Sequence, residues 1–129
     1  MAQVKVYGLR TSLSTFKNEL SEAIHESLME AFGLPPEKRF QRFFLLNRDE
    51  FVFPADRSEN YTIVEISVFE GRSAEAKKQL INTLFSRVEA RTKLSPQDLE
   101  ITIVETPRAN WGIRGKPGDE LTLDYKVDV

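Results

Sequence analysis

A short stretch near the middle of the chain combines residue types that bind carboxylates. Arg72 directly precedes Ser73, a residue typical of a helix N-cap, and the apolar periodicity after Ser73 predicts a helix. The backbone N–H groups and dipole at a helix N-terminus favour an anion. A guanidinium adds planar, bidentate recognition of a carboxylate. The pattern predicts a small-carboxylate site at Arg72; the alternative is an ion pair with Glu70 or with a partner subunit.

Three further side chains are candidates for such a site. Trp111, flanked by Asn110 and Gly112, fits either the core or the wall of a pocket. Asn110 would offer an amide donor to a ligand oxygen, although a role in loop structure explains it equally well. Lys38 follows a Pro-Pro-Glu run. It would bind an anion, act as an amine of lowered pKa if desolvated, or remain a solvated loop charge.

Composition excludes several other classes of chemistry. The 129 residues contain no cysteine and one histidine, so disulfides, thiolate catalysis and cysteine metal sites are excluded, and His25 alone argues against a metal centre. With 18 Lys+Arg against 20 Asp+Glu, the chain lacks the basic charge of a nucleic-acid binder. No apolar run approaches the ~18 residues of a membrane span. We expect a small cytoplasmic protein with no metal, no cofactor, no nucleic-acid partner and no membrane partner.

Hydrophobic periodicity in the first half predicts a strand, a helix and two more strands. Residues 3–9 alternate as a strand, and a turn at residues 11–14 leads into a helix that stops at Gly33. A second strand is expected at about 40–46. The polar run 47–50 then resembles a hairpin turn into a short strand at 51–53.

The second half repeats this order. Residues 61–69 are rich in β-branched side chains and indicate a central strand with both faces apolar. A helix capped by Ser73 is expected to end near Lys93, followed by a short helical turn at 95–98 and a strand at 100–105. A last strand is expected at 121–127.

Two β-α-β units in sequence predict an α+β fold. We expect one domain over 1–129, built by internal duplication of about 1–60 and 61–129, with a four-stranded sheet and both helices on one face. Because the other face of the sheet is expected to be apolar in places, self-association would cover it.

The same segments resemble the tautomerase superfamily. Residues 69–73 and 105–115 resemble a 4-oxalocrotonate tautomerase subunit, and residues 31–35 and 39–41 resemble the malonate semialdehyde decarboxylase branch. The resemblance spans roughly residues 2–115. It implies a tautomerase/MIF-like fold, a homotrimer, and isomerase chemistry that rests on an N-terminal proline exposed after methionine removal, with arginines that bind a carboxylate.

Carried over residue by residue, the resemblance retains little of that chemistry. Arg72 matches one family arginine, whereas Glu70 stands at the position of another. Lys38 stands where the decarboxylase branch has an aspartate. Trp111 matches an aromatic residue that lines the apolar wall of the family pocket. Ala2 occupies the position of the proline.

Ala2 would still supply an amine if Met1 is removed. An α-amino group has a pKa of about 7.7–8.0, so part of it is neutral near pH 7 and could act as a base or form a Schiff base. The alternative is an inert terminus. Two functions follow: a weak keto–enol tautomerase of 2-oxo acids or related enols, with Ala2 and Arg72 as catalytic groups, or a non-catalytic trimeric binding or structural relative.

Overall fold

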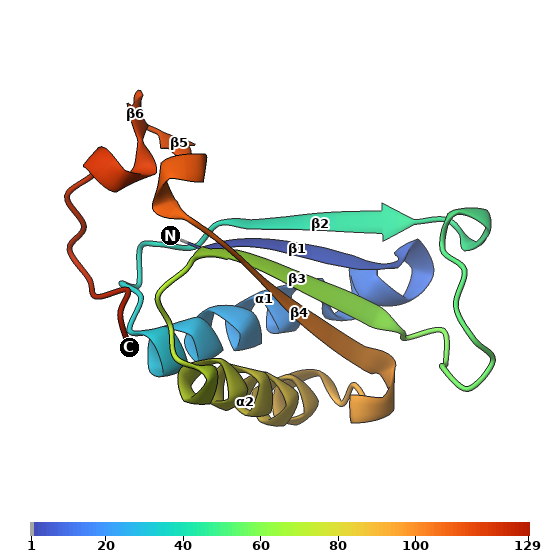
Figure 1. Ribbon diagram of the computed structural model, residues 1–129. Coiled ribbons are helices and arrows are strands. Elements are labelled where there is room, and N and C mark those ends of the chain that lie inside the picture. Colours follow the sequence, from blue (N-terminus) through green and yellow to red (C-terminus); the bar gives the residue numbers. More distant parts are fainter. Residues whose placement is uncertain (1) are drawn as a thin grey trace.

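The computed structural model describes residues 2–129 and contains one four-stranded sheet with two long helices (Figure 1). The strands and α-helices of this main body are β1 (Ala2–Leu9), α1 (Arg10–Phe32), β2 (Gln41–Leu46), β3 (Thr62–Phe69), α2 (Ala74–Thr92) and β4 (Leu99–Thr106). The 3-10 helices are η1 (Arg48–Glu50), η2 (Pro96–Asp98), η3 (Arg108–Asn110) and η4 (Gly118–Glu120), and a small hairpin is formed by β5 (Gly112–Ile113) and β6 (Lys116–Pro117).

The sheet consists of two parallel β-α-β units joined by an antiparallel pair. Its strand order is β2-β1-β3-β4, with β1 parallel to β2, β3 parallel to β4, and β1 antiparallel to β3. Both helices lie side by side on one face of this sheet (Figure 1). The predicted α+β class, with a four-stranded sheet and two helices on one face, is confirmed.

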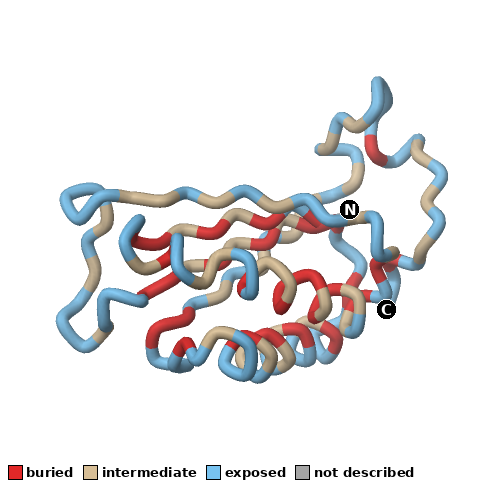
Figure 2. The backbone as a smooth tube through the Cα atoms, turned by 180° about the vertical axis from the view of Figure 1, so that it is seen from behind, coloured by how far each residue is buried: buried red, intermediate tan, exposed pale blue. Residues whose placement is uncertain are grey.

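The core lies between this sheet face and the helices, where the buried segments concentrate (Figure 2). Alternating strand residues such as Val4, Val6 and Ile66 point into it, and Leu20 and Leu84 meet them from the two helices. The helix ends follow their sequence signals: Gly33 terminates α1 in the left-handed conformation at φ 66°, and the Ser73 hydroxyl accepts a hydrogen bond from the Ala76 N–H at 3.1 Å.

The uncovered face of the sheet is apolar only in places, as expected, but the prediction that β3 is apolar on both faces was wrong. The apolar positions Val64, Ile66 and Val68 are an even number of residues apart, so all of them point toward the helices. The uncovered face instead carries groups such as Tyr7, whose hydroxyl donates to Glu65 at 2.6 Å and whose ring stacks on Phe44 at 4.8 Å.

Three further element predictions were wrong. Residues 11–14, expected as a turn, form the first turns of α1. Residues 51–53, expected as a strand, pair with no strand among the described residues, because Phe51 and Phe53 pack on Tyr61 instead. Residues 121–127 form no strand, although their apolar side chains alternate.

No helix within residues 2–129 combines the length and apolar character of a membrane span.

Candidate functional site

Phe69, the last residue of β3, is the point where the candidate residues of the second half meet. Its ring is fully buried. Its carbonyl accepts a hydrogen bond from Arg72 Nη1 at 3.2 Å. The Trp111 ring packs edge-on against the Phe69 ring at a centroid distance of 5.1 Å, and the Arg108 guanidinium carbon lies 5.4 Å from the same ring centroid. The structure therefore brings Arg72 and Trp111, both predicted from the sequence, to one place.

Arg72 is a buried cation with unused hydrogen-bonding capacity. It is 5% exposed, and its guanidinium carbon lies 4.7 Å from the centroid of the Phe32 ring. Nε and Nη2 have no hydrogen-bond partner within residues 2–129, and the ion pair with Glu70 considered above does not form. Buried donors of a guanidinium are costly when unpaired. An anion at this position would satisfy them.

Burial and the nearby carboxylates have opposite effects on the pKa of Arg72. Burial lowers the pKa of Arg72 below its ordinary value, because the charged form loses hydration. The carboxylates of Glu105 and Asp128 raise that pKa in part. Neither carboxylate makes an ion pair with Arg72 among the described residues, since Glu105 is held by Lys77 Nζ at 2.6 Å. The Arg72 charge is thus balanced at a distance and not by contact.

The N-terminus of α2 lies directly after Arg72. The Ser73 side chain caps the helix through the Ala76 N–H, as predicted. The backbone N–H of Ser73 donates to the Val129 carbonyl at 3.3 Å. The C-terminal residues 121–129, called here the tail, therefore reach this helix end.

Arg108 holds the start of the tail, a role that the sequence analysis missed. Its Nε and Nη2 donate to the Gly118 carbonyl at 3.2 and 3.1 Å, and Nη2 also donates to the Leu121 carbonyl at 3.1 Å. A surface cavity of about 520 Å³ lies between Arg108 and tail residues that include Leu123, Tyr125 and Asp128. Arg108 lies in the 105–115 stretch singled out above, but no spacing rule marks it as a residue that binds backbone carbonyls.

Trp111 combines a core contact with a fixed orientation. Its Nε1 donates to Thr106 Oγ1 at 2.7 Å, and its ring belongs to a small apolar cluster with Phe69 and Val127. The Trp111 side chain is partly exposed. This geometry fits both alternatives left open for Trp111, a core residue and a pocket wall.

Ala2 lies at the start of β1, at the end of the sheet where β3 finishes. It is 4% exposed and pairs with Val68, which in turn pairs with Glu105 on β4. Strand pairing thus places Ala2, Val68 and Glu105 in one row, close to the point where the chain turns toward Arg72. The removal of Met1, on which the Ala2 amine depends, lies outside the described residues.

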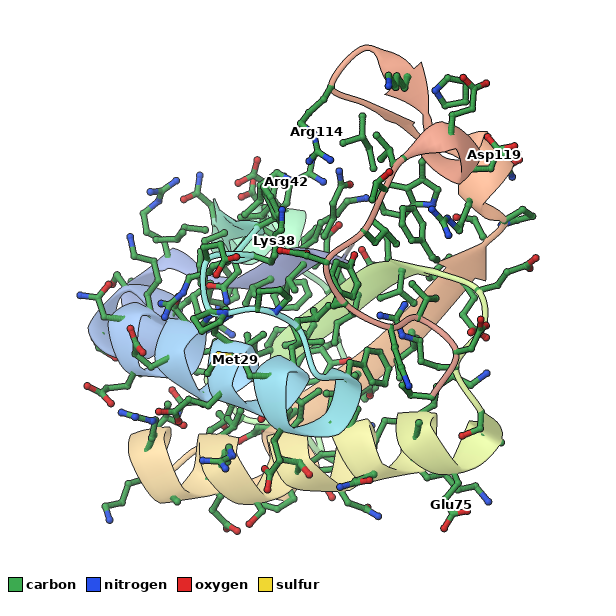
Figure 3. All side chains as sticks on the ribbon, turned by 90° about the vertical axis from the view of Figure 1, so that its left-hand side faces the viewer. Met29, Lys38, Arg42, Glu75, Arg114 and Asp119 are labelled. Atoms are coloured by element: carbon green, nitrogen blue, oxygen red, sulfur yellow. The ribbon has the colours of Figure 1, made fainter. Side chains whose placement is uncertain are left out.

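Within residues 2–129, no hydrogen bond or ion pair joins the side chain of Lys38 or Asn110 to Phe69, Arg72 or Trp111. Asn110 is exposed at the end of η3, and Lys38 lies in the turn after α1, where its backbone N–H donates to the Pro35 carbonyl at 3.0 Å. Figure 3 shows Lys38 at the end of the molecule that also carries Arg42 and Arg114. Within residues 2–129, Lys38 and Arg114 have no ion-pair partner. These residues form a basic rim near the sheet edge and not part of the buried site.

His25 and the two arginines near the start of β2, Arg39 and Arg42, have partners within the fold. His25 is buried, and its Nε2 lies 2.7 Å from the Pro36 carbonyl oxygen, so this histidine connects α1 to the following turn. Arg39 pairs with Glu22 at 2.9 Å, and Arg42 donates to Gln3 at 3.3 Å.

The fold and the site together define a class of protein: a small α+β protein with a buried arginine at the start of its second helix. The family described as "Tautomerase enzyme" matches residues 38–114, and the chain belongs to this family. The probable tautomerase YusQ of Bacillus subtilis (strain 168) is 22% identical over 98 residues, which cover 72% of this chain and 77% of that protein. The probable tautomerase RSp0893 of Ralstonia nicotianae is 33% identical over 55 residues, covering 43% and 79%.

Solved structures show the same fold. A malonate semialdehyde decarboxylase superposes with a TM-score of 0.80 at 23% identity, covering 92% of this chain and 99% of that one. A native fused 4-OT superposes with a TM-score of 0.79 at 19% identity, covering 92% and 98%. The R7 fused 4-OT, described as an asymmetric trimer, gives 0.79 at 19% identity, covering 91% and 96%. The predicted membership in the tautomerase superfamily is confirmed.

Proposed function

We propose that this tautomerase-family protein binds a small 2-oxo carboxylate at Arg72 and catalyses slow keto–enol proton transfer on it. One observation carries the proposal: Arg72 is 5% exposed, lies at the N-terminus of α2, and has Nε and Nη2 unpartnered within residues 2–129. A ligand carboxylate at these nitrogens would gain charge-assisted hydrogen bonds, and an enolate would be stabilised as its charge develops.

The remaining roles follow from the positions of the other candidates. The Ala2 amine, which is free only if Met1 is removed, is the proposed acid–base group, because β1 starts at the same end of the sheet as the Arg72 turn. The partly exposed Trp111 ring is the proposed apolar wall. Asn110, which is exposed at the end of η3, and Lys38, in the turn after α1, are proposed to meet the substrate at the entrance of the site. The reaction as proposed requires no cofactor.

The proposed assembly is a homotrimer in the cytoplasm. Support comes from the uncovered sheet face, where the Tyr7–Phe44 stack leaves Phe44 37% exposed and Val104 is 43% exposed. Related fused 4-OT proteins are described as trimers. The net charge of −2 gives no reason to propose a nucleic-acid partner.

A non-catalytic binding protein is the second candidate, and the residue at position 2 favours it. Ala2 provides a primary amine where the resembling family has a proline, so the carboxylate site could persist without turnover.

The proposed activity is tested with phenylenolpyruvate as the enol, by following its ketonisation with wild-type protein and with Arg72→Ala. Enzymatic ketonisation that is lost in Arg72→Ala supports the tautomerase. Pyruvate binding that depends on Arg72, with no ketonisation above the buffer rate, favours the binding protein.

A further inference from the structure

The tail covers the anion site in the structure described here. It passes from η4 toward the N-terminus of α2 without forming a helix or strand (Figure 1). Arg108 binds the Leu121 carbonyl at its start, and Leu123, Tyr125 and Val127 pack on the Phe69 cluster. At its end the Val129 carbonyl accepts a hydrogen bond from the Ser73 N–H. The tail therefore spans from Arg108 to the helix end beside Arg72.

The contact at the helix end uses a donor that a ligand would need. The Ser73 N–H is one of the donors at the start of α2 that have no partner inside the helix. It donates instead to a backbone carbonyl of the tail. Arg72 itself is 5% exposed beneath the same region. A ligand carboxylate could not reach both groups while the tail stays in this position.

The tail also places a carboxylate at this point. Asp128 packs so closely on Gly71 that a Cβ there would lie 2.7 Å from Asp128 Oδ1. Gly71 has φ 132°, a conformation that favours glycine, and no side chain separates the Asp128 carboxylate from the turn that carries Arg72. The Asp128 carboxylate stabilises the charged form of Arg72 without forming an ion pair among the described residues.

We propose that Asp128 is an internal competitor for the Arg72 site and that tail residues 127–129 must lift for a ligand carboxylate to bind. Asp128 thereby sets the affinity of the site, because an incoming carboxylate replaces its electrostatic contribution. This inference rests on the proposed function, in which Arg72 binds a carboxylate.

The attachment of the tail suits such a movement. Residues 127–129 take part in no sheet or helix, and Asp128 is exposed, so lifting these three residues breaks the Val127 packing, the Asp128–Gly71 contact and the Ser73–Val129 hydrogen bond. Segments with few buried contacts open more readily than the core they cover. The Arg108 contacts at Gly118 and Leu121 would stay intact and act as the fixed end.

The test compares Asp128→Asn with Asp124→Asn, which removes the same charge from an exposed position of the same tail. Pyruvate is the probe, and binding is followed by calorimetry and by the fluorescence of Trp111, the single tryptophan, which shares a cluster with Val127. Because Asp128 is exposed, we expect Asp128→Asn to bind pyruvate about three- to fivefold more tightly, with Asp124→Asn within about twofold of wild type.

Hydrogen exchange of residues 121–129 supplies the second readout. Pyruvate should increase exchange in the tail of the wild type, because the bound anion holds the tail open. Equal pyruvate affinity in the two asparagine variants, or slower exchange in the tail on binding, would overturn the inference. Arg72→Ala separates the two proposals: loss of pyruvate binding in Arg72→Ala together with equal affinities in the asparagine variants keeps the proposed function and rejects the role of Asp128.

Discussion

The guanidinium of Arg72 stacks on the ring of Phe32, with 4.7 Å between the guanidinium carbon and the ring centroid. Phe32 is the last residue of α1 and Arg72 precedes α2, so this contact joins the two β-α-β units at the candidate site. A ring face can stabilise a desolvated cation without using its N–H groups. Phe32 therefore allows Arg72 to be buried while Nε and Nη2 stay available to an anion.

Replacing this ring should destabilise the fold. Phe32→Leu keeps an apolar side chain but removes the ring face, and we expect an extra loss of about 1–2 kcal/mol in the free energy of unfolding relative to Phe16→Leu. Phe16 is the control because it packs against the same core from α1 without a cation above it. Urea denaturation of both variants measures the difference, and equal losses would show that the Arg72–Phe32 contact carries little energy.

The amine at position 2 should limit the rate of enol chemistry. Ala2→Pro would supply a secondary amine at the start of β1, and we expect faster ketonisation of phenylenolpyruvate than in the wild type. Ala2→Ser is the matched control, since it keeps a small residue and a primary amine.

Intact-mass analysis of each protein establishes whether Met1 has been removed. High wild-type activity that is the same in all position-2 variants would place the acid–base group elsewhere.

The uncovered sheet face should be the contact surface of the proposed trimer. Phe44→Lys adds a charge beside Tyr7 on this face, and we expect the trimer to dissociate because the charge would be buried on assembly. Asn82→Lys, on the exposed side of α2, is the control. Light scattering at micromolar concentration distinguishes the species; a Phe44→Lys trimer, or a wild-type monomer, would contradict this surface.

The ion pairs between the helices should make stability depend on pH. Arg91 holds the pKa of Glu26 below its ordinary value through a hydrogen bond at 2.6 Å. A depressed folded-state pKa contributes stability above the unfolded value of 4.5, and this contribution is lost as the pH falls through the folded pKa. Glu26→Gln should therefore be less stable than the wild type at pH 7, with the difference shrinking below about pH 4.5.

Glu37→Gln is the control, because Glu37 has no ion pair within residues 2–129. Thermal unfolding at several pH values measures both variants. A difference between Glu26→Gln and the wild type that stays constant from pH 7 to acid would show that the Glu26 charge does not matter.

Periodicity in the sequence predicted the main fold because it reports which side of an element is buried. Ser73 and Gly33 marked helix ends for local reasons that need no tertiary information. The tail shows the limit of this reasoning. Leu121, Leu123, Tyr125 and Val127 alternate as in a strand, but Leu123, Tyr125 and Val127 pack on the cluster around Phe69, and no strand lies beside them. Alternating apolar residues show which side of a segment is buried. They do not show whether the segment is a strand or an irregular stretch.

The candidate site was predictable only where its chemistry is local. Arg72 could be found because it adjoins a helix N-cap, and Trp111 because the resemblance covers it. Phe32 and Asp128 were not predicted as neighbours of the site, because their contacts with the Arg72 region depend on how the two β-α-β units and the tail pack together. Lys38 was assigned to the site through the resemblance and Asn110 as a neighbour of Trp111, and their roles stay predictions; Asn110 is exposed at the end of η3, and Lys38 lies in the turn after α1.

The central claim, that Arg72 binds a small carboxylate, is tested most directly by titrating pyruvate into the wild type, Arg72→Ala, Arg72→Lys and Arg114→Ala. Charge-assisted hydrogen bonds contribute about 1.5–3 kcal/mol each, so Arg72→Ala should bind at least about tenfold more weakly. Arg72→Lys should recover part of this affinity, because an ammonium lacks the planar fork. Arg114→Ala, which removes an exposed arginine of the rim, should match the wild type. Equal affinity in the wild type and Arg72→Ala would contradict the account.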